Sequence, residues 1–347
     1  MPHIYIYSPS GAVRDRAALR RGVRRLQALG HEVQVDEAAL ASHQRFAGDD
    51  ATRLAAIARA AASGADVALI TRGGYGLTRL LPALPYEALA RAAQQGTRFV
   101  GLSDFTALQM ALLAQTGAIT WAGPTLCADF GCPGEPDEIM QACFGDLLSG
   151  EGEGTGWRLP APRPAKSAQL LAPQPAPVPG KLHVQDALLW GGNLSTLCAL
   201  AGTPWLPSIQ GGVLFLEDVG EHPYRIERML CQLLHAGVLD VQQAVLLGSF
   251  SAYKPVPHDR GFNLNEAVHW LRAQTRTPIL SGLPMGHVPT KVLLPVGARV
   301  ELLLEGRDAW LLWGHMDGHS HPHSHPHSHP HGHEHGHEHA CLHCGQA

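Results

Sequence analysis

The chain has 347 residues, a length that exceeds one usual domain and predicts two. Apolar residues make up 45% and charged residues 16%, and the formal charge of -4 lacks the basic excess of nucleic-acid-binding proteins. No uncharged apolar stretch reaches the roughly 20 residues that cross a bilayer. The first apolar run is also too short for a signal-peptide core. We therefore expect a cytoplasmic protein that binds neither nucleic acid nor membrane.

The N-terminal part of the chain alternates short apolar strands with helices. Residues 3–7 form a β-rich run that precedes a helical apolar pattern, and the apolar segment 66–71 has the character of a buried strand. Asp49 and Asp50 can cap the alanine-rich helix that follows them. This alternation predicts an α/β domain over residues 1–150, with a doubly wound parallel sheet of the Rossmann or flavodoxin type.

The composition changes twice after the first domain. Repeated proline marks residues 151–180 as a linker, because proline forbids regular helix and central strand. Apolar strands alternate with helical stretches again over 181–313, which predicts a smaller C-terminal α/β domain. Residues 314–347 are almost wholly histidine alternating with small or polar residues, and such a tail cannot bury a core. We expect the tail to be disordered without a ligand.

Two loops that follow strands of the first domain supply candidate catalytic groups, because ligands of such sheets bind beyond the carboxyl ends of the strands. Ser103 lies between a strand and a helix, where its hydroxyl is exposed and backbone N–H groups point at a developing oxyanion. The alternative is that Ser103 or Asp104 only caps the helix. The RGGYG segment at Arg72 lets the backbone approach a substrate closely, or it is an ordinary turn. It lacks the Lys-Ser/Thr ending of a P-loop, which disfavours nucleotide hydrolysis.

The second domain contains candidate acids and bases. Glu217 and Asp218 end an apolar strand, where either carboxylate can orient an imidazole or be a solvated strand terminus. His287 lies on a loop after a strand and is a candidate general base for a serine hydroxyl. His222 and His258 are competing candidates, and any of the three can also be a structural histidine.

The combination of these segments resembles the LD-carboxypeptidase (muramoyltetrapeptide carboxypeptidase) family of serine peptidases. The resemblance extends to about Trp313, and its motifs occur in the family's order. They are SPSG at Ser8, RFAG at Arg45, RGGYG at Arg72, GLSDFTALQ at Gly101, WGGNL at Trp190, GTPW at Gly202, LEDVGEHPYRIERML at Leu216, GSF at Gly248, GLPMGH at Gly282 and LLPVGA at Leu293.

The resemblance implies roles that the residues alone leave open. The family's nucleophile falls on Ser103, its histidine on His287 and its carboxylate on Glu217. The backbone amides of Gly74 and Asp104 fall where the oxyanion hole would be. The resemblance also implies an active site in the cleft between the two domains, a homodimer, and catalysis without a cofactor or an active-site metal.

The activity implied by the resemblance is that of a serine-type LD-carboxypeptidase. Its substrate is the murein tetrapeptide of peptidoglycan recycling, and the bond cleaved joins meso-diaminopimelate to the terminal D-alanine. Such an enzyme must recognise a free carboxylate, for which Arg72 and Arg225 are candidates. A related branch, which resembles the microcin-immunity serine peptidases, uses the same catalytic groups to cleave a peptidyl-nucleotide. That activity is the alternative function within the family.

The C-terminal tail suggests a function of another class. From His315 to His343, histidines recur about every second residue, and Cys341 and Cys344 add thiol ligands. These ligands predict binding of Zn or Ni by the His-rich tail. A metal-binding or metal-storage protein is therefore the alternative to an enzyme, unless the tail is only solvating or its metal affinity is incidental. A non-catalytic binding protein that uses the cleft is the third interpretation.

Overall fold

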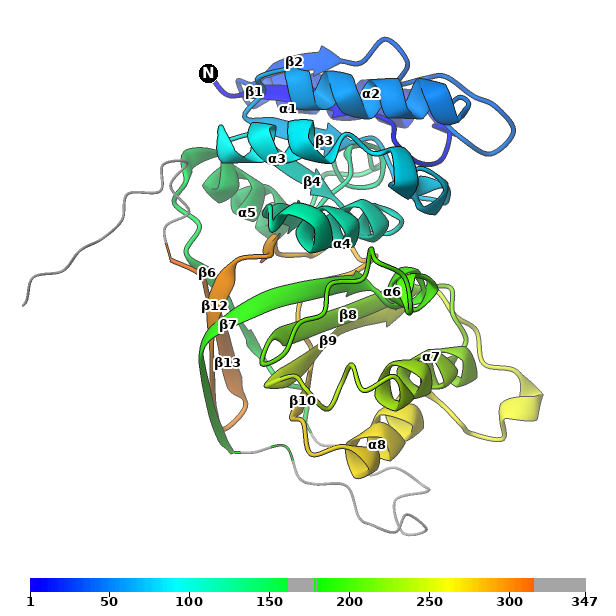
Figure 1. The fold of residues 1–347 in the computed structure, drawn as a ribbon, viewed down its shortest axis with the longest axis vertical. Coiled ribbons are helices and arrows are strands. Elements are labelled where there is room, and N and C mark those ends of the chain that lie inside the picture. The colour runs from blue at the N-terminus through cyan, green and yellow to red at the C-terminus, as the bar shows by residue number, and fades with distance from the viewer. Residues whose placement is uncertain (162–177, 179, 315–347) are drawn as a thin grey trace, which may run out of the picture.

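The computed structural model describes residues 1–161, 178 and 180–314, and two sheets organise them into two α/β domains (Figure 1). The first sheet has the strand order β11-β5-β4-β3-β1-β2. Strands β1 to β5 are parallel, and β11 is antiparallel to β5 at the edge. Without β11, this is the 2-1-3-4-5 order of flavodoxin-like sheets, so the predicted doubly wound domain is confirmed. The strands are β1 (His3–Tyr7), β2 (Glu32–Val35), β3 (Val67–Ile70), β4 (Arg98–Gly101), β5 (Thr120–Ala122) and β11 (Leu294–Val296).

Helices cover both faces of this sheet because its strands are apolar on both sides. In β1, Tyr5 and Tyr7 belong to the buried cluster on one face, whereas Ile4 and Ile6 belong to the cluster on the other. The first cluster includes side chains of α2 (Asp50–Ala62), α3 (Tyr86–Gln94) and α4 (Phe105–Thr116). The second includes side chains of α1 (Arg16–Ala28), the π-helical turn η3 (Leu126–Phe130) and α5 (Glu138–Ser149).

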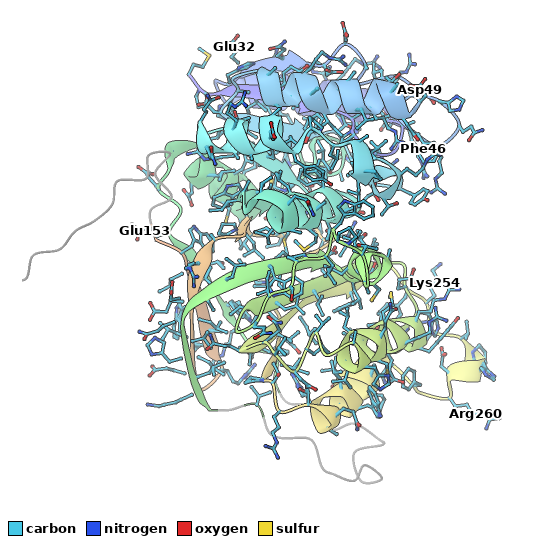
Figure 2. The ribbon with its side chains drawn as sticks, viewed as in Figure 1. Glu32, Phe46, Asp49, Glu153, Lys254 and Arg260 are labelled. Carbon is cyan, nitrogen blue, oxygen red and sulfur yellow. The ribbon has the colours of Figure 1, made fainter. Side chains whose placement is uncertain are left out.

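The start of α2 shows how the sequence sets a helix boundary. Asp49 has extended backbone dihedrals, and its side chain accepts a hydrogen bond from the Thr52 amide at 2.8 Å. This bond satisfies one of the free N–H groups of the first turn. Figure 2 shows Asp49 at this helix end and Phe46 in the loop that precedes it. The predicted capping of this helix is confirmed.

The second sheet has the strand order β10-β9-β8-β7-β12-β13-β6. Strands β7 to β10 are parallel, and the remaining pairs are antiparallel. Its strands are β6 (Gly154–Arg158), β7 (Lys181–Asn193), β8 (Val213–Val219), β9 (Ala244–Ser251), β10 (Ile279–Ser281), β12 (Arg299–Glu305) and β13 (Asp308–Leu312). Its helices are α6 (Leu194–Leu200), α7 (Pro223–His235) and α8 (Leu264–Gln274). The second domain is thus α/β, as predicted.

Two strands, β6 and β11, lie outside the sheets expected from the predicted domain boundaries. Strand β6 lies within the expected linker 151–180 and pairs with β13, because the prolines begin only at Pro160 and leave the earlier residues free to pair. Strand β11 lies within the expected domain 181–313 yet joins the first sheet. Its Pro295 lacks an N–H group, which suits an edge position. The chain therefore returns to the first domain after β10.

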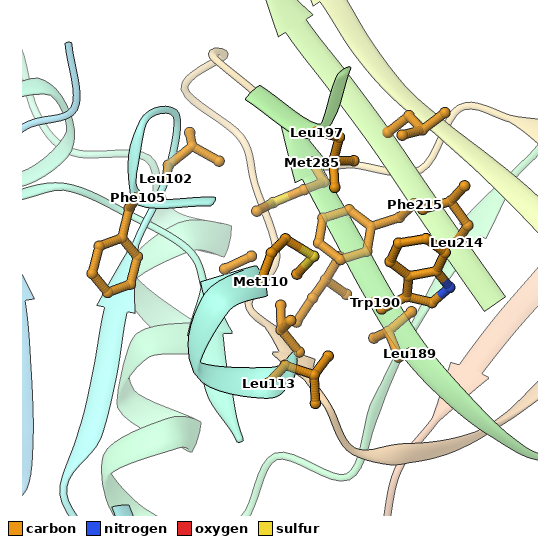
Figure 3. Close-up of a cluster of buried hydrophobic side chains, with 14 of the residues drawn as sticks. Leu102, Phe105, Met110, Leu113, Leu189, Trp190, Leu197, Leu214, Phe215 and Met285 are labelled. Atoms are coloured by element: carbon orange, nitrogen blue, oxygen red, sulfur yellow. The ribbon is translucent and has the colours of Figure 1, made fainter. Parts of the chain in front are cut away.

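Helix α4 joins the two domains through a continuous apolar core. Every residue from Phe105 to Leu113 is buried, so this helix has no solvent-exposed face over that length. Figure 3 shows Met110 and Leu113 pointing toward Trp190 and Phe215 of the second sheet. Each such buried side chain stabilises the interface by about 1.5–3 kcal/mol. Because Ser103 directly precedes Asp104, the N-cap residue of α4, the interface also fixes the position of this serine.

Candidate active site

A cavity of about 630 Å³ opens between the two domains. Its walls include the loops that follow β3 and β4, the segment around η3, and the loop that follows β10. These loops lie at the carboxyl ends of parallel strands, where ligands bind in open α/β sheets. The charged or potentially reactive residues of the lining include Arg72, Ser103, Asp129, Asp137, His287 and Lys291. The cleft between the domains, where an active site is expected from the sequence, thus contains a cavity that both domains line.

Ser103 occupies a strained turn between β4 and α4. Its φ is 69°, in the left-handed region that residues other than glycine rarely adopt. A Cβ atom placed on Gly73 would lie 2.5 Å from the Ser103 Cβ and 2.8 Å from its Oγ. The backbone of residue 73 therefore packs directly against the serine hydroxyl, and only glycine fits there. A strained serine on a sharp strand-to-helix turn is the geometry of a nucleophile elbow.

The RGGYG loop is held by the loop that follows β1. The Gly11 amide donates a hydrogen bond to the Gly73 carbonyl at 3.3 Å, and a Cβ on Gly74 would lie 3.3 Å from the Gly11 Cα. Gly74 itself has a φ of 119° and lines the cavity. This close approach requires glycine at both positions. The loop thus presents backbone atoms to the cavity beside Ser103.

Asp104 has a buried side chain that faces away from the cavity lining. Its Oδ2 accepts a hydrogen bond from the Leu77 amide at 3.0 Å, and burial raises the pKa of this carboxyl group. This contact ties the start of α4 to the 3₁₀ turn η1 (Leu77–Arg79). If residue 104 binds an anion in the cavity, it therefore does so through its backbone amide and not through its side chain.

Glu217 and His287 form a hydrogen-bonded pair. The His287 Nδ1 lies 2.7 Å from the Glu217 Oε2. The Glu217 side chain is fully buried, whereas the His287 ring is 23% exposed and lines the cavity. A buried carboxylate on Nδ1 holds the ring so that Nε2 is free to accept a proton. The other Glu217 oxygen accepts a hydrogen bond from the Asn193 Nδ2 at 3.2 Å.

Asp218 makes a different set of contacts, although it is the next residue of β8. Its Oδ2 accepts hydrogen bonds from the Ser195 amide at 2.9 Å and from the Ser195 Oγ at 2.6 Å. Its Oδ1 accepts from the Asn193 Nδ2 at 3.0 Å. These bonds satisfy the first turn of α6. The structure therefore brings Glu217, and not Asp218, to His287.

The competing histidines lie elsewhere. His222 is the N-cap residue of α7, and its Nε2 lies 3.2 Å from Asp259. His258 lies on the 3₁₀ turn η5 (Pro257–Asp259). Neither belongs to the cavity lining, which contains His287.

Asn193 is a site residue that sequence reasoning missed. It is the N-cap residue of α6, and the Thr196 amide donates to its Oδ1 at 3.1 Å. Its amide group also contacts both acidic residues of β8, and its backbone N–H donates to the Thr106 Oγ1 of α4 at 3.1 Å. The signal available in the sequence was the WGGNL motif, in which Asn follows a strand and begins a helix.

A buried ion pair connects the loop after His287 to the first domain. The Lys291 ammonium contacts the Asp129 carboxylate, and both side chains are at most 5% exposed. The second Asp129 oxygen accepts a hydrogen bond from the Thr125 amide at 2.7 Å. One residue earlier, the Thr290 Oγ1 donates to the Asp137 Oδ2 at 2.6 Å. The His287 loop is thus fixed to the first domain by polar contacts at its far end.

We expect replacement of Lys291 with methionine to destabilise the protein by about 3–5 kcal/mol, because the Asp129 carboxylate would stay buried without its partner. Urea unfolding followed by circular dichroism measures this change. The Lys291→Met, Asp129→Asn double variant should regain part of the loss, since it no longer buries an unpaired charge. A single variant as stable as the wild type would show that the pair contributes nothing.

Neither a metal cluster nor a membrane helix is found in the described part of the chain. Residues 1–161, 178 and 180–314 contain no group of three or more His, Cys, Asp or Glu side chains arranged to hold a metal ion. Over the same ranges, no helix has the length and apolar character to span a bilayer. Of the predicted tail, residues 314–347, the structure describes Gly314, and the predicted metal-binding histidines and cysteines lie outside the described residues.

Several named proteins are similar to this chain in sequence or in fold. The crystal structure of muramoyltetrapeptide carboxypeptidase from Oxalobacter formigenes is 37% identical, with a TM-score of 0.77 over 90% of this chain and 98% of that chain. The Bacillus subtilis protein named "Probable murein peptide carboxypeptidase" is 30% identical over 278 residues, which are 80% of this chain and 81% of the relative.

A third relative is the microcin C7 self-immunity protein of Escherichia coli, which is 28% identical over 255 residues, 69% of this chain and 71% of that protein. A structure of the microcin C7 self-immunity protein in complex with aspartyl sulfamoyl adenosine has a TM-score of 0.77 at 23% identity, over 91% of this chain and 97% of that one, a likeness of fold alone. The LD-carboxypeptidase N-terminal domain matches residues 4–123, and the C-terminal domain matches residues 186–302. The chain therefore belongs to the LD-carboxypeptidase family of peptidases.

Proposed function

We propose that this protein is a serine carboxypeptidase that removes the terminal D-alanine from murein tetrapeptides by cleaving its bond to meso-diaminopimelate. The observation that carries the proposal is the buried Glu217–His287 pair, 2.7 Å between carboxylate and ring, which faces the same cavity as the strained Ser103. The names of the Oxalobacter and Bacillus relatives support murein peptides as the substrate.

In the proposed reaction, the Ser103 Oγ attacks the carbonyl carbon of the scissile bond while the His287 Nε2 accepts the hydroxyl proton. Glu217 orients the ring and stabilises the imidazolium that forms. The C–N bond then breaks, and His287 returns the proton to the leaving D-alanine amine. Water hydrolyses the acyl-enzyme by the same proton transfers in reverse order. No step requires a metal ion or a cofactor.

The oxyanion of the tetrahedral intermediate needs N–H donors beside Ser103. We assign this role to the backbone amides of Gly74 and Asp104. Gly74 supports the assignment because it lines the cavity in the loop whose Gly73 packs against the serine hydroxyl. Asp104 supports it because its amide lies at the start of α4, where helix N–H groups favour negative charge.

Mass spectrometry of a purified murein tetrapeptide tests the proposed function. We expect wild-type protein to release one alanine, to do so in the presence of a chelator, and to leave unchanged a tetrapeptide that ends in L-alanine. A tetrapeptide that stays intact contradicts the murein substrate. If a peptidyl-nucleotide is cleaved instead, the activity is that of the microcin-immunity branch of the family.

Three further properties stay predictions of the sequence. We propose that the enzyme works in the cytoplasm, where returned wall fragments are available, and as a homodimer. We also propose that the histidine tail binds Zn or Ni as an accessory, since its imidazoles and thiols suit these metals. Truncation before Gly314 should then abolish binding of several zinc ions in calorimetry and leave alanine release intact. Loss of alanine release on truncation would contradict the accessory role.

A further inference from the structure

The charged side chains that line the cavity differ in what neutralises them. Lys291 forms an ion pair with Asp129, and Asp137 accepts hydrogen bonds from Thr290 and from the first turn of α5. Arg72 makes no ion pair with any acidic side chain of the described residues. Of the two permanent cations of the lining, Arg72 is therefore the one without a counter-ion within the described parts of the chain.

The surroundings of the Arg72 guanidinium repel positive charge. Its Nη1 donates one hydrogen bond, to the Ala12 carbonyl at 3.2 Å. Burial lowers the pKa of Arg72, repulsion from Arg14 and Arg45 lowers it further, and Cys127 acts in the opposite direction. Arginine nevertheless stays protonated in proteins. A half-buried cation with cationic neighbours is stabilised when an anion binds to it.

One of these neighbouring cations lies over an aromatic ring. The Arg45 guanidinium lies 5.5 Å from the centroid of the Tyr75 ring, and the Tyr75 ring lies 5.9 Å from that of Phe46. Tyr75 follows Gly74 in the RGGYG loop, and Phe46 lies in the loop before α2 (Figure 2). The positive charge beside Arg72 is thus part of the folded loop arrangement.

The Arg72 guanidinium and the Ser103 hydroxyl lie beside consecutive residues of the RGGYG loop. A Cβ on Gly74 would be 3.2 Å from the Arg72 Nη1, and Gly73 packs directly against the Ser103 hydroxyl. In the substrate of a carboxypeptidase, the free carboxylate belongs to the residue that directly follows the scissile bond. Consecutive Cα atoms are about 3.8 Å apart. Because the Arg72 Nη1 lies beside Gly74 and the Ser103 Oγ beside the preceding Gly73, we infer that a single residue of a ligand can span the two groups.

We propose that Arg72 binds the free α-carboxylate of the C-terminal residue that is released, and that this contact restricts the enzyme to the last residue of a peptide. The inference rests on the proposed function. A guanidinium can hold a carboxylate through two parallel N–H donors, which fixes its orientation as well as its charge. Arg225, the other candidate, has a 51% exposed side chain, lies 3.7 Å from Glu221 and is not part of the lining.

A matched pair of substrates tests this role. The murein tetrapeptide with a free terminal carboxylate is compared with the same peptide ending in a carboxamide, and kcat/KM is measured for each. We expect wild-type protein to prefer the acid on the order of 100-fold, since hydrogen bonds to charged groups are the strong ones. Arg72→Gln should bring this ratio to roughly 1–10, and Arg72→Lys should lie between the two because it keeps the charge and loses the fork. Arg225→Gln should keep the wild-type ratio.

The outcomes separate the two proposals. If wild-type protein releases alanine but does not distinguish acid from amide, the role of Arg72 is overturned and the proposed function stands. If folded Arg72→Gln protein, checked by circular dichroism, keeps the full preference, another group binds the carboxylate. If wild-type protein releases alanine from neither peptide, the proposed function fails, and the role of Arg72 fails with it. The acid-to-amide ratio does not depend on the fraction of active protein, so partial misfolding does not imitate the effect.

Discussion

Replacement of Ser103 with alanine should lower kcat for D-alanine release by about 10⁴–10⁶-fold, because it removes the hydroxyl that is proposed to form the acyl-enzyme. The remaining rate would come from substrate binding and the oxyanion hole. The fold should be retained, since Ser103 is a turn residue and its side chain carries none of the interdomain core. Single-turnover kinetics with the murein tetrapeptide measures the change, and a circular dichroism spectrum checks the fold.

The control is Ser149→Ala, which removes a hydroxyl from the exposed end of α5 outside the cavity lining and should leave kcat unchanged. A second comparison uses the backbone strain at φ 69°. Ser103→Gly should be as inactive as Ser103→Ala and more stable than it, by about 1 kcal/mol, because glycine adopts this conformation without strain. If Ser103→Ala retained a tenth of the wild-type rate, the nucleophile would have to be a different group.

Glu217→Gln should lower kcat by about 10⁴-fold with little change in KM. The loss of kcat is expected from the contacts of the Glu217 carboxylate. Asn193 donates from its Nδ2 to one oxygen of Glu217, so a glutamine would place its carbonyl there and turn its NH₂ group toward His287. The His287 Nδ1 would then be an acceptor, and the proton would move to Nε2. A ring protonated at Nε2 cannot accept the proton of Ser103.

Glu221→Gln provides the matched control, because it is the same change four residues later on a side chain that pairs with Arg225 and lies outside the cavity lining. Its kcat should equal that of the wild type. The Glu217→Gln, Ser103→Ala double variant should have the same kcat as Ser103→Ala alone, since the effects of substitutions within one catalytic unit are not additive. Fully additive losses in the double variant would show that Glu217 acts independently of the serine.

Much of the fold follows from local sequence patterns. The apolar stripe and the starting proline of residues 223–235 predict a helix, and α7 begins at Pro223 and ends at His235. The alternation of HIYIY predicts a strand, and β1 occupies the same residues. Local patterns also predict the loops of the candidate site. Glycine-rich turns after apolar strands, in the order of the family motifs, indicate Ser103 and the RGGYG loop from the sequence alone.

The pairing of the site residues could not be predicted in the same way. Glu217 and Asp218 are neighbours on β8, and successive strand residues point to opposite sides. The residue types therefore do not predict which of the two carboxylates contacts His287. The register of β8 against β9 shifts between Leu216 and Asp218, and this irregularity accompanies the arrangement in which Glu217 meets the histidine and Asp218 meets the start of α6.

The sequence by itself thus determined the family, the order of strands and helices, and the residues that the family motifs mark. The tertiary structure decided which charges are neutralised. Arg72 belongs to a family motif and Lys291 lies between two of them, but only the fold brings Asp129 to Lys291 and leaves Arg72 in the cavity lining beside other cations. The physical reason is that charge interactions depend on distance and burial, and both are set by contacts between segments far apart in the chain.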